Sequence, residues 1–263
     1  MTHVAWLDGV ALWSPRLPGY AHAARVFRGI AAPADPPAAR PAPALLAPTE
    51  RRRAPDTVAI ALAVASEACA AAGVEPTGLA SVFASSEGDL AISDYMCATL
   101  ASDPKLISPT RFHNSVHNAA SGYWTIATGC HAPATSVSAW RETWATGLVE
   151  ALLQARDAGR ALYVAYDIEA AGPMRTVCDA RGMLGTALVA ASEASAASRW
   201  RLEWSTRARR DGDDVAPHAH HAEGSPIARA LELYAALAAE SVRTLTLPLS
   251  RGLTLELTVE PTA

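Results

Sequence analysis

The alternation of short apolar runs with longer helical segments between residues 57 and 192 constrains the fold of this chain more than any other feature. Four runs have the apolar and β-branched character of strands: 79–84, 134–140, 161–169 and 184–192. Four segments have helical character, three of them ending at a glycine: 57–72, 92–100, 119–128 and 141–159. Such alternation predicts an α/β fold with a mostly parallel sheet and helices on both faces.

Both ends of the chain add further strands to this pattern. Residues 4–15 favour a strand or a short hairpin around Asp8-Gly9, and 201–207 alternate as a strand does. Ser225 and Pro226 open a helix that runs to about Ala239, and a hairpin around 250–252 ends the sequence. We therefore expect an α/β part over 1–195 and a short α+β tail over 196–263, packed on the same domain.

Charge and composition exclude several classes of function. The net charge is −4 and the pI near 6.1, so neither nucleic acid nor an anionic membrane is favoured as a partner. No run reaches the roughly 18 apolar residues of a membrane span, and the start lacks a signal-peptide pattern. The four scattered cysteines indicate reduced thiols, and hence a cytoplasmic protein.

The segment SPTRFHNSVHNAASGYWTIATG, residues 108–129, resembles the loop and helix that precede the nucleophile strand of β-ketoacyl synthases. It is especially similar to small ketosynthase-like proteins of aryl-polyene and xanthomonadin-type pigment pathways. The resemblance extends over residues 1–195. It implies a thiolase-like half with a mixed, mostly parallel five-stranded sheet and helices on both faces.

The same resemblance implies a chemistry whose parts are missing here. A condensing enzyme places a cysteine at the start of a helix, where the helix dipole favours the thiolate, and uses two histidines to stabilise an oxyanion. The family's nucleophile position falls on Glu142, with Arg141 as the alternative register, and no cysteine lies between Cys130 and Cys178. The histidine motifs H-G-T and G-H-x-x-G are also absent. We therefore expect no catalytic residue, no cofactor and no metal.

This pattern resembles chain-length factors, which lack the cysteine and pair with a catalytic ketosynthase subunit. The resemblance implies a heterodimer that reaches an acyl carrier protein through the complex, with strand 134–140 pairing across a two-fold axis. The residues expected at the interface or along the partner's acyl tunnel are Phe112, Asn114, His117, Asn118, Trp124, Ser136, Ser138, Trp140 and Trp144.

Other interpretations of these residues stay open. The Asn114–Asn118 loop could simply cap the next helix, with Asn118 as its N-cap, and Glu142 could be a favourable first-turn acid. His218, His220 and His221 are expected in a solvated loop. Two rival functions are a divergent transferase or decarboxylase using Glu142, His113 or His117, and a homodimeric module that binds acyl groups or carrier proteins.

Overall fold

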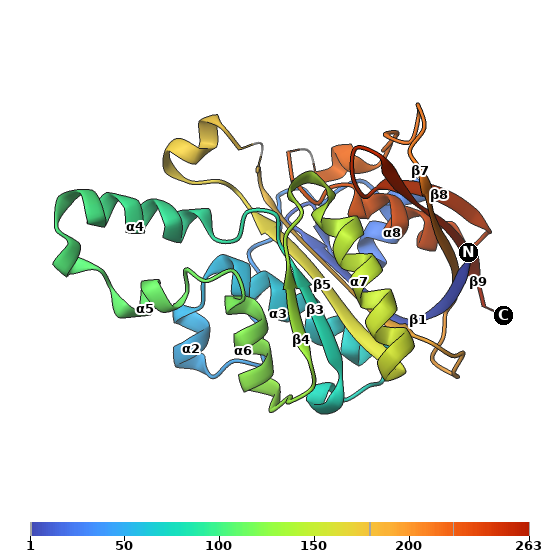
Figure 1. Cartoon of the computed structure of the whole chain (residues 1–263), viewed down its shortest axis with the longest axis horizontal. Helices are drawn as coiled ribbons and strands as arrows, with labels where there is room; N and C mark the ends of the chain where they lie inside the picture. The colour runs from blue at the N-terminus through green and yellow to red at the C-terminus, as the bar shows by residue number, and fades with distance from the viewer. Residues whose placement is uncertain (1, 179, 223, 263) are drawn as a thin grey trace.

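Nine strands form one sheet in the computed structural model, which describes residues 2–178, 180–222 and 224–262 (Figure 1). Their order across the sheet is β4-β3-β5-β6-β1-β7-β9-β8, and the short β2 pairs with β1. The strands are β1 (His3–Ser14), β2 (Leu17–Pro18), β3 (Ala80–Ala84), β4 (Ala134–Val137), β5 (Arg160–Ile168), β6 (Met183–Ala191), β7 (Trp200–Ala208), β8 (Arg243–Pro248) and β9 (Leu253–Pro261).

Helices cover both faces of this sheet. They are α1 (Tyr20–Phe27), α2 (Pro48–Arg53), α3 (Asp56–Ala72), α4 (Leu90–Ser102), α5 (Pro109–His113), α6 (Ala119–Thr128), α7 (Thr143–Ala158) and α8 (Ala230–Ala238). Helices α3 and α6 share one apolar core with the sheet, and α1, α7 and α8 share the core on the other face. In the described part of the chain, no helix is long and apolar enough to cross a membrane.

Strand direction confirms the predicted thiolase-like α/β half. Strand β3 runs parallel to β4 and β5, whereas β6 is antiparallel to β5 and to β1. Four of the five strands β4-β3-β5-β6-β1 therefore point the same way and β6 opposes them. Helix α3 can approach β1 closely because Gly9 has no side chain: a Cβ there would lie 2.3 Å from the Ala68 carbonyl oxygen.

The tail continues the sheet with three strands, and together with the short β2 they bring the predicted five strands to nine. Strand β7 pairs antiparallel with the first half of β1, and β9 and β8 follow outward from it. An unpaired β1 edge would leave a row of backbone groups without partners, and β7 satisfies them. The division at residue 195 stays a prediction.

Three local expectations differ from the structure. The predicted strand 134–140 ends at Val137, and Trp140–Glu142 forms a 3₁₀ turn. The predicted loop 108–118 contains helix α5, because Ser108 caps it and Pro109 occupies its first position. Residues 218–221 do not form the fully solvated loop that was expected. Both the backbone N–H and Nδ1 of His218 contact the Glu232 carboxylate, at 2.7 and 3.0 Å.

Candidate functional site

The turn between β4 and α7 has the geometry of a strained elbow. Trp140 has a φ of 53°, a conformation that costs a bulky residue free energy unless its surroundings impose it. Thr143 imposes it here: its Oγ1 accepts from the Ala139 N–H at 2.8 Å and donates to the Trp140 carbonyl at 2.7 Å. The strained position is therefore Trp140, two residues before Glu142, which lies at the N-cap of α7.

Helix α7 is held firmly behind this elbow. Gly147 lets the helix touch the sheet, because a Cβ at that position would lie 2.7 Å from the Tyr163 ring. The Tyr163 hydroxyl donates to the Trp144 carbonyl at 2.6 Å, and the Trp144 indole donates to Thr186 Oγ1 at 3.0 Å. The helix that follows the elbow is thus fixed to the core by packing and by two buried hydrogen bonds.

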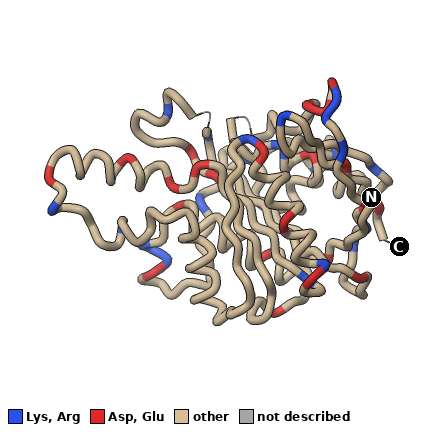
Figure 2. The backbone as a smooth tube through the Cα atoms, in the orientation of Figure 1, with Lys and Arg blue, Asp and Glu red and all other residues tan. Residues whose placement is uncertain are grey.

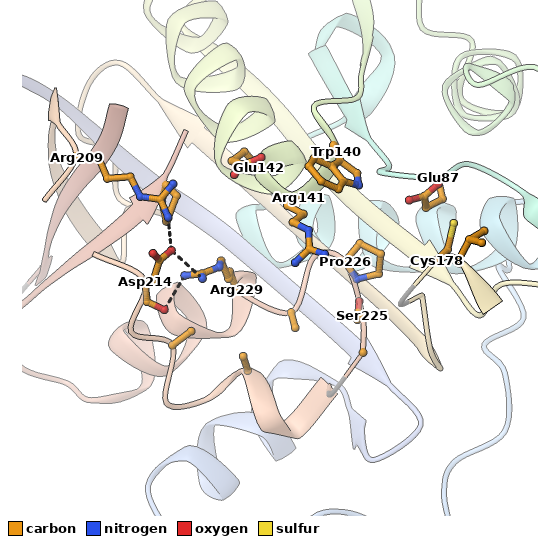
Figure 3. A pocket seen from close by; sticks show the side chains of 16 residues that line it. Glu87, Trp140, Arg141, Glu142, Cys178, Arg209, Asp214, Ser225, Pro226 and Arg229 are labelled. Carbon is orange, nitrogen blue, oxygen red and sulfur yellow. Dashed lines mark hydrogen bonds and ion pairs between the residues drawn. The ribbon is translucent and has the colours of Figure 1, made fainter. Parts of the chain in front are cut away.

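A cavity of about 470 Å³ lies in front of the elbow (Figure 3). Trp140, Arg141 and Glu142 form one side, with Glu87 and Cys178 nearby, and the C-terminal part of the chain closes the other side. The Trp140 side chain is 63% exposed, and the Arg141 guanidinium carbon lies 5.0 Å from its ring centroid. The segment expected to hold the nucleophile therefore faces a real cavity.

Arginines and a carboxylate from the tail build the far wall of this cavity. Arg209 and Arg229 both donate to Oδ1 of Asp214, as the dashed lines of Figure 3 show. The hydrogen bond from Arg209 lowers the pKa of the Asp214 carboxyl and raises that of the guanidinium, which the Glu142 charge raises further. The far wall of the cavity is therefore formed by two ion pairs, which join Arg209 and Arg229 to Asp214.

A buried carboxylate organises the turn beside the elbow. Asp167, in β5, accepts from Ser85 Oγ at 2.8 Å and from the backbone N–H groups of Ser86 and Glu87 at 3.0 and 3.3 Å. Burial raises the pKa of Asp167 to about 6, and these hydrogen bonds partly oppose the rise. Nε2–H of His117 donates to the Ser85 carbonyl oxygen at 2.9 Å, so the predicted 114–118 loop is anchored to the same turn.

The described lining of the cavity differs from the condensing centre that the family resemblance implied. It contains no histidine. Cys178 is the cysteine among the described lining residues, and it lies after the 3₁₀ turn Gly172–Thr176, not at a helix start. Sequence reasoning set Cys178 aside because it follows strand β5. Only the fold of the loop after β5 brings it beside the elbow.

The predicted interface residues separate into two groups. Trp124, Trp144 and Asn114 are buried within this chain, and their role at the interface or tunnel stays a prediction. The exposed or half-exposed members are Phe112, His117, Asn118, Ser136, Ser138 and Trp140. Asn118 does occupy the N-cap of α6, but its side chain makes no capping hydrogen bond.

Strand β4 is the end strand of the sheet, and it lies in a long stretch of sequence without charged residues. It pairs with β3 alone among the described strands. Between Arg111 and Arg141 the sequence contains no Lys, Arg, Asp or Glu, and Figure 2 shows the resulting bare region over α6 and β4. Depletion of charge is typical of the centre of a protein interface.

Helices α4 and α5 form an arm that projects from the body beside this edge (Figure 1). Few of its side chains are buried in the chain: Leu90, Ile92 and Thr99 in α4, and none in α5. Three of its large apolar side chains, Leu100, Leu106 and Phe112, are more than half exposed. An arm of this kind exposes apolar surface that a partner would be expected to cover.

Comparison with solved structures shows the fold. The chain has a mixed α/β, thiolase-like fold, and the solved structures that share it include the following three, which match over nearly their whole length. A chain from the complex of the ketosynthase ApeO with its chain length factor ApeC from Xenorhabdus doucetiae has a TM-score of 0.74 at 19% identity, covering 97% of this chain and 99% of that one.

The other two structures are similar at lower identity. A chain of the ishigamide ketosynthase/chain length factor has a TM-score of 0.72 at 14% identity, covering 99% of this chain and 100% of that one. A chain from AntDE:AntF, a type II polyketide acyl-carrier protein in complex with its ketosynthase, has a TM-score of 0.71 at 11%, covering all of both chains.

The family itself is shown by the sequence. The model of the β-ketoacyl synthase N-terminal domain matches residues 28–252, and this chain belongs to that family. No curated protein sequence is significantly similar to it.

Proposed function

We propose that this chain is a non-catalytic, chain-length-factor-like subunit that pairs with a catalytic β-ketoacyl synthase and shapes the partner's acyl tunnel. The observation that carries the proposal is the elbow, which presents Trp140-Arg141-Glu142 to its cavity in place of a cysteine. Aryl-polyene or related polyene and fatty-acyl elongation is the proposed setting. An acyl carrier protein would be reached through the complex.

The free edge of β4 supports pairing with that subunit. The carbonyl of Pro133 accepts from the Ser81 N–H in β3, and that of Val137 accepts from the Ser85 N–H just after β3. Because backbone direction alternates along a strand, the N–H and C=O of Ser136 point away from β3 toward the open edge. The partner's matching strand could add there and continue the sheet. The uncharged stretch from 112 to 140 would lie in the centre of that interface.

The test is co-expression with the ketosynthase encoded nearest to this chain, followed by size exclusion and an assay of acyl–malonyl condensation. We expect a stable one-to-one complex that is active when the ketosynthase retains its cysteine. Condensation by the isolated chain would refute the non-catalytic role. A ketosynthase that is fully active alone and never binds this chain would refute the partnership.

A matched pair of variants probes the β4 edge specifically. Ser136→Pro removes the outward N–H, whereas Ser136→Ala keeps it, and both lose the same 3.2 Å contact with the Ser121 hydroxyl. Loss of this one edge hydrogen bond, at about 1 kcal/mol, should weaken the Ser136→Pro complex about fivefold relative to Ser136→Ala. Equal affinity of the two folded variants would place the interface elsewhere.

A further inference from the structure

The turn in front of α7 contains one position with the geometry of a nucleophile. A nucleophile that follows a strand is presented on a sharp, strained turn into a helix, which exposes its reacting atom. Here β4 ends at Val137, the 3₁₀ turn begins at Trp140, and Trp140 has the positive φ of 53°. Glu142 has an ordinary φ of −96°. The position with this geometry is therefore 140, two residues before the one expected from the sequence.

The Trp140 side chain also has the access to the cavity that a nucleophile needs. Its indole is 63% exposed and lines the cavity of about 470 Å³ (Figure 3). A cavity of this size is large enough to hold a small ligand. Because the ring is so exposed, packing of the side chain contributes little to offset the backbone strain. Strain of this kind is typical of functional sites, where the surrounding structure imposes it.

The strained conformation belongs to the backbone of the turn and not to the tryptophan side chain. The fully buried Thr143 holds it, because its Oγ1 accepts from the Ala139 N–H at 2.8 Å and donates to the Trp140 carbonyl at 2.7 Å. Both hydrogen bonds use backbone atoms of residues 139 and 140. A different side chain at position 140 would therefore be held in the same place.

We propose that position 140 is the nucleophile position of this elbow, and that Trp140 is the residue that prevents this chain from accepting an acyl group. The inference rests on the proposed non-catalytic role and names the residue responsible for it. An indole cannot form a thioester. An acyl chain that reaches the complex is therefore loaded on the partner subunit alone.

Trp140→Cys would supply the missing group. The thiolate sulfur would attack the carbonyl carbon of an acyl thioester, forming a new carbon–sulfur bond. The carbon–sulfur bond of the donor breaks, and the donor leaves as a thiolate that takes up a proton from water. The helix start and the Arg141 guanidinium favour the introduced thiolate, whereas the Glu87 and Glu142 carboxylates disfavour it. The other charged or titratable groups in the described lining are Cys178, Arg209, Asp214 and Arg229.

The test places a cysteine at each of three positions in the full chain, which also carries Cys178→Ser. The variants Trp140→Cys, Arg141→Cys and Glu142→Cys are incubated with octanoyl-coenzyme A, and the acyl adduct is located by mass spectrometry of the digested chain. We expect the adduct on Trp140→Cys to form at least about tenfold faster than at the other two positions. It should also form at least about tenfold faster than at the exposed Cys97, which every variant contains.

Two further pairs of variants test the positioning by Thr143 and the strain. Added to Trp140→Cys, Thr143→Val removes both hydrogen bonds at similar volume and should slow adduct formation about tenfold, whereas Thr143→Ser keeps both and should retain it. Trp140→Gly should unfold at a higher urea concentration than Trp140→Ala, because glycine adopts a positive φ without strain.

Three results would overturn the assignment. Faster acylation of Arg141→Cys or Glu142→Cys would move the nucleophile position to that residue. The absence of an adduct on Trp140→Cys would show that Trp140 is not what prevents loading. A Trp140→Ala variant at least as stable as Trp140→Gly would show that the position is not strained. All three measurements use the isolated chain, so the absence of a complex with the ketosynthase would refute the proposed partnership and not this assignment.

Discussion

Asp167→Asn should change how the stability of this chain depends on pH. The carboxyl is 1% exposed, and burial raises its pKa from 3.8 to about 6 in the folded protein. Because the folded state binds this proton more tightly than the unfolded state, Asp167 costs stability as pH rises from about 4 to about 6. Asparagine cannot ionise, so the folded Asp167→Asn variant does not lose this stability as pH rises.

The size of the effect follows from the shift. A difference of about two pKa units at about 1.4 kcal/mol each gives about 3 kcal/mol. Asparagine Oδ1 can still accept from Ser85 Oγ and the Ser86 and Glu87 N–H groups, which share one oxygen of Asp167. The free energy of unfolding of Asp167→Asn, minus that of the wild type, should therefore rise by up to about 3 kcal/mol between pH 4 and pH 7.

This difference is measured by urea unfolding, followed by tryptophan fluorescence, at a series of pH values. The contributions of the other titrating groups to stability are the same in both proteins and cancel in the difference. Asp157→Asn, at a side chain that is 73% exposed, is the control for the exchange of a carboxylate for an amide. A difference that stays flat with pH for Asp167→Asn would show that burial does not govern this carboxyl. A falling one would show that its hydrogen bonds outweigh burial.

Two further predictions concern packing and thiol chemistry. Gly147→Ala should lower the free energy of unfolding by about 1–3 kcal/mol, measured by urea denaturation, because the new methyl would lie 2.7 Å from the Tyr163 ring. Its control is Gly122→Ala, where the new methyl meets open space, and no loss of stability of that size is expected there. Burial raises the pKa of Cys69 to about 12, so iodoacetamide at pH 7 should alkylate the exposed Cys97 and leave Cys69 unmodified by mass spectrometry. Equal losses of stability in the first pair, or equal labelling in the second, would contradict these expectations.

Several parts of the fold could be predicted because they depend on local physics. Gly73 and Gly129 adopt the left-handed conformation that ends α3 and α6, where the sequence placed both helix ends. The β-branched and aromatic run 161–169 forms a strand buried along nearly all of its length. The absence of a cysteine between Cys130 and Cys178, and so from the elbow segment itself, is likewise a property of the sequence, and the proposed loss of condensing activity depends on it.

Which side chains are buried and which are exposed could not be predicted in the same way. Trp124, Trp140 and Trp144 looked alike as candidates for an interface, yet only Trp140 is exposed. The other two lie on helix faces that pack on opposite sides of the sheet, and strand order decides which face is covered. The register of the elbow also depended on backbone geometry, since the positive φ falls on Trp140 and not on Arg141 or Glu142.

The sequence by itself determined the alternating elements, their glycine ends, the missing nucleophile and the family, because each depends on residues close together in the chain. Only the tertiary structure brought Cys178 to the cavity of the elbow, joined the tail to β1 and raised the pKa of Asp167. Those features arise from contacts between residues distant in sequence, and periodicity within one segment contains no information about which other segment will cover it.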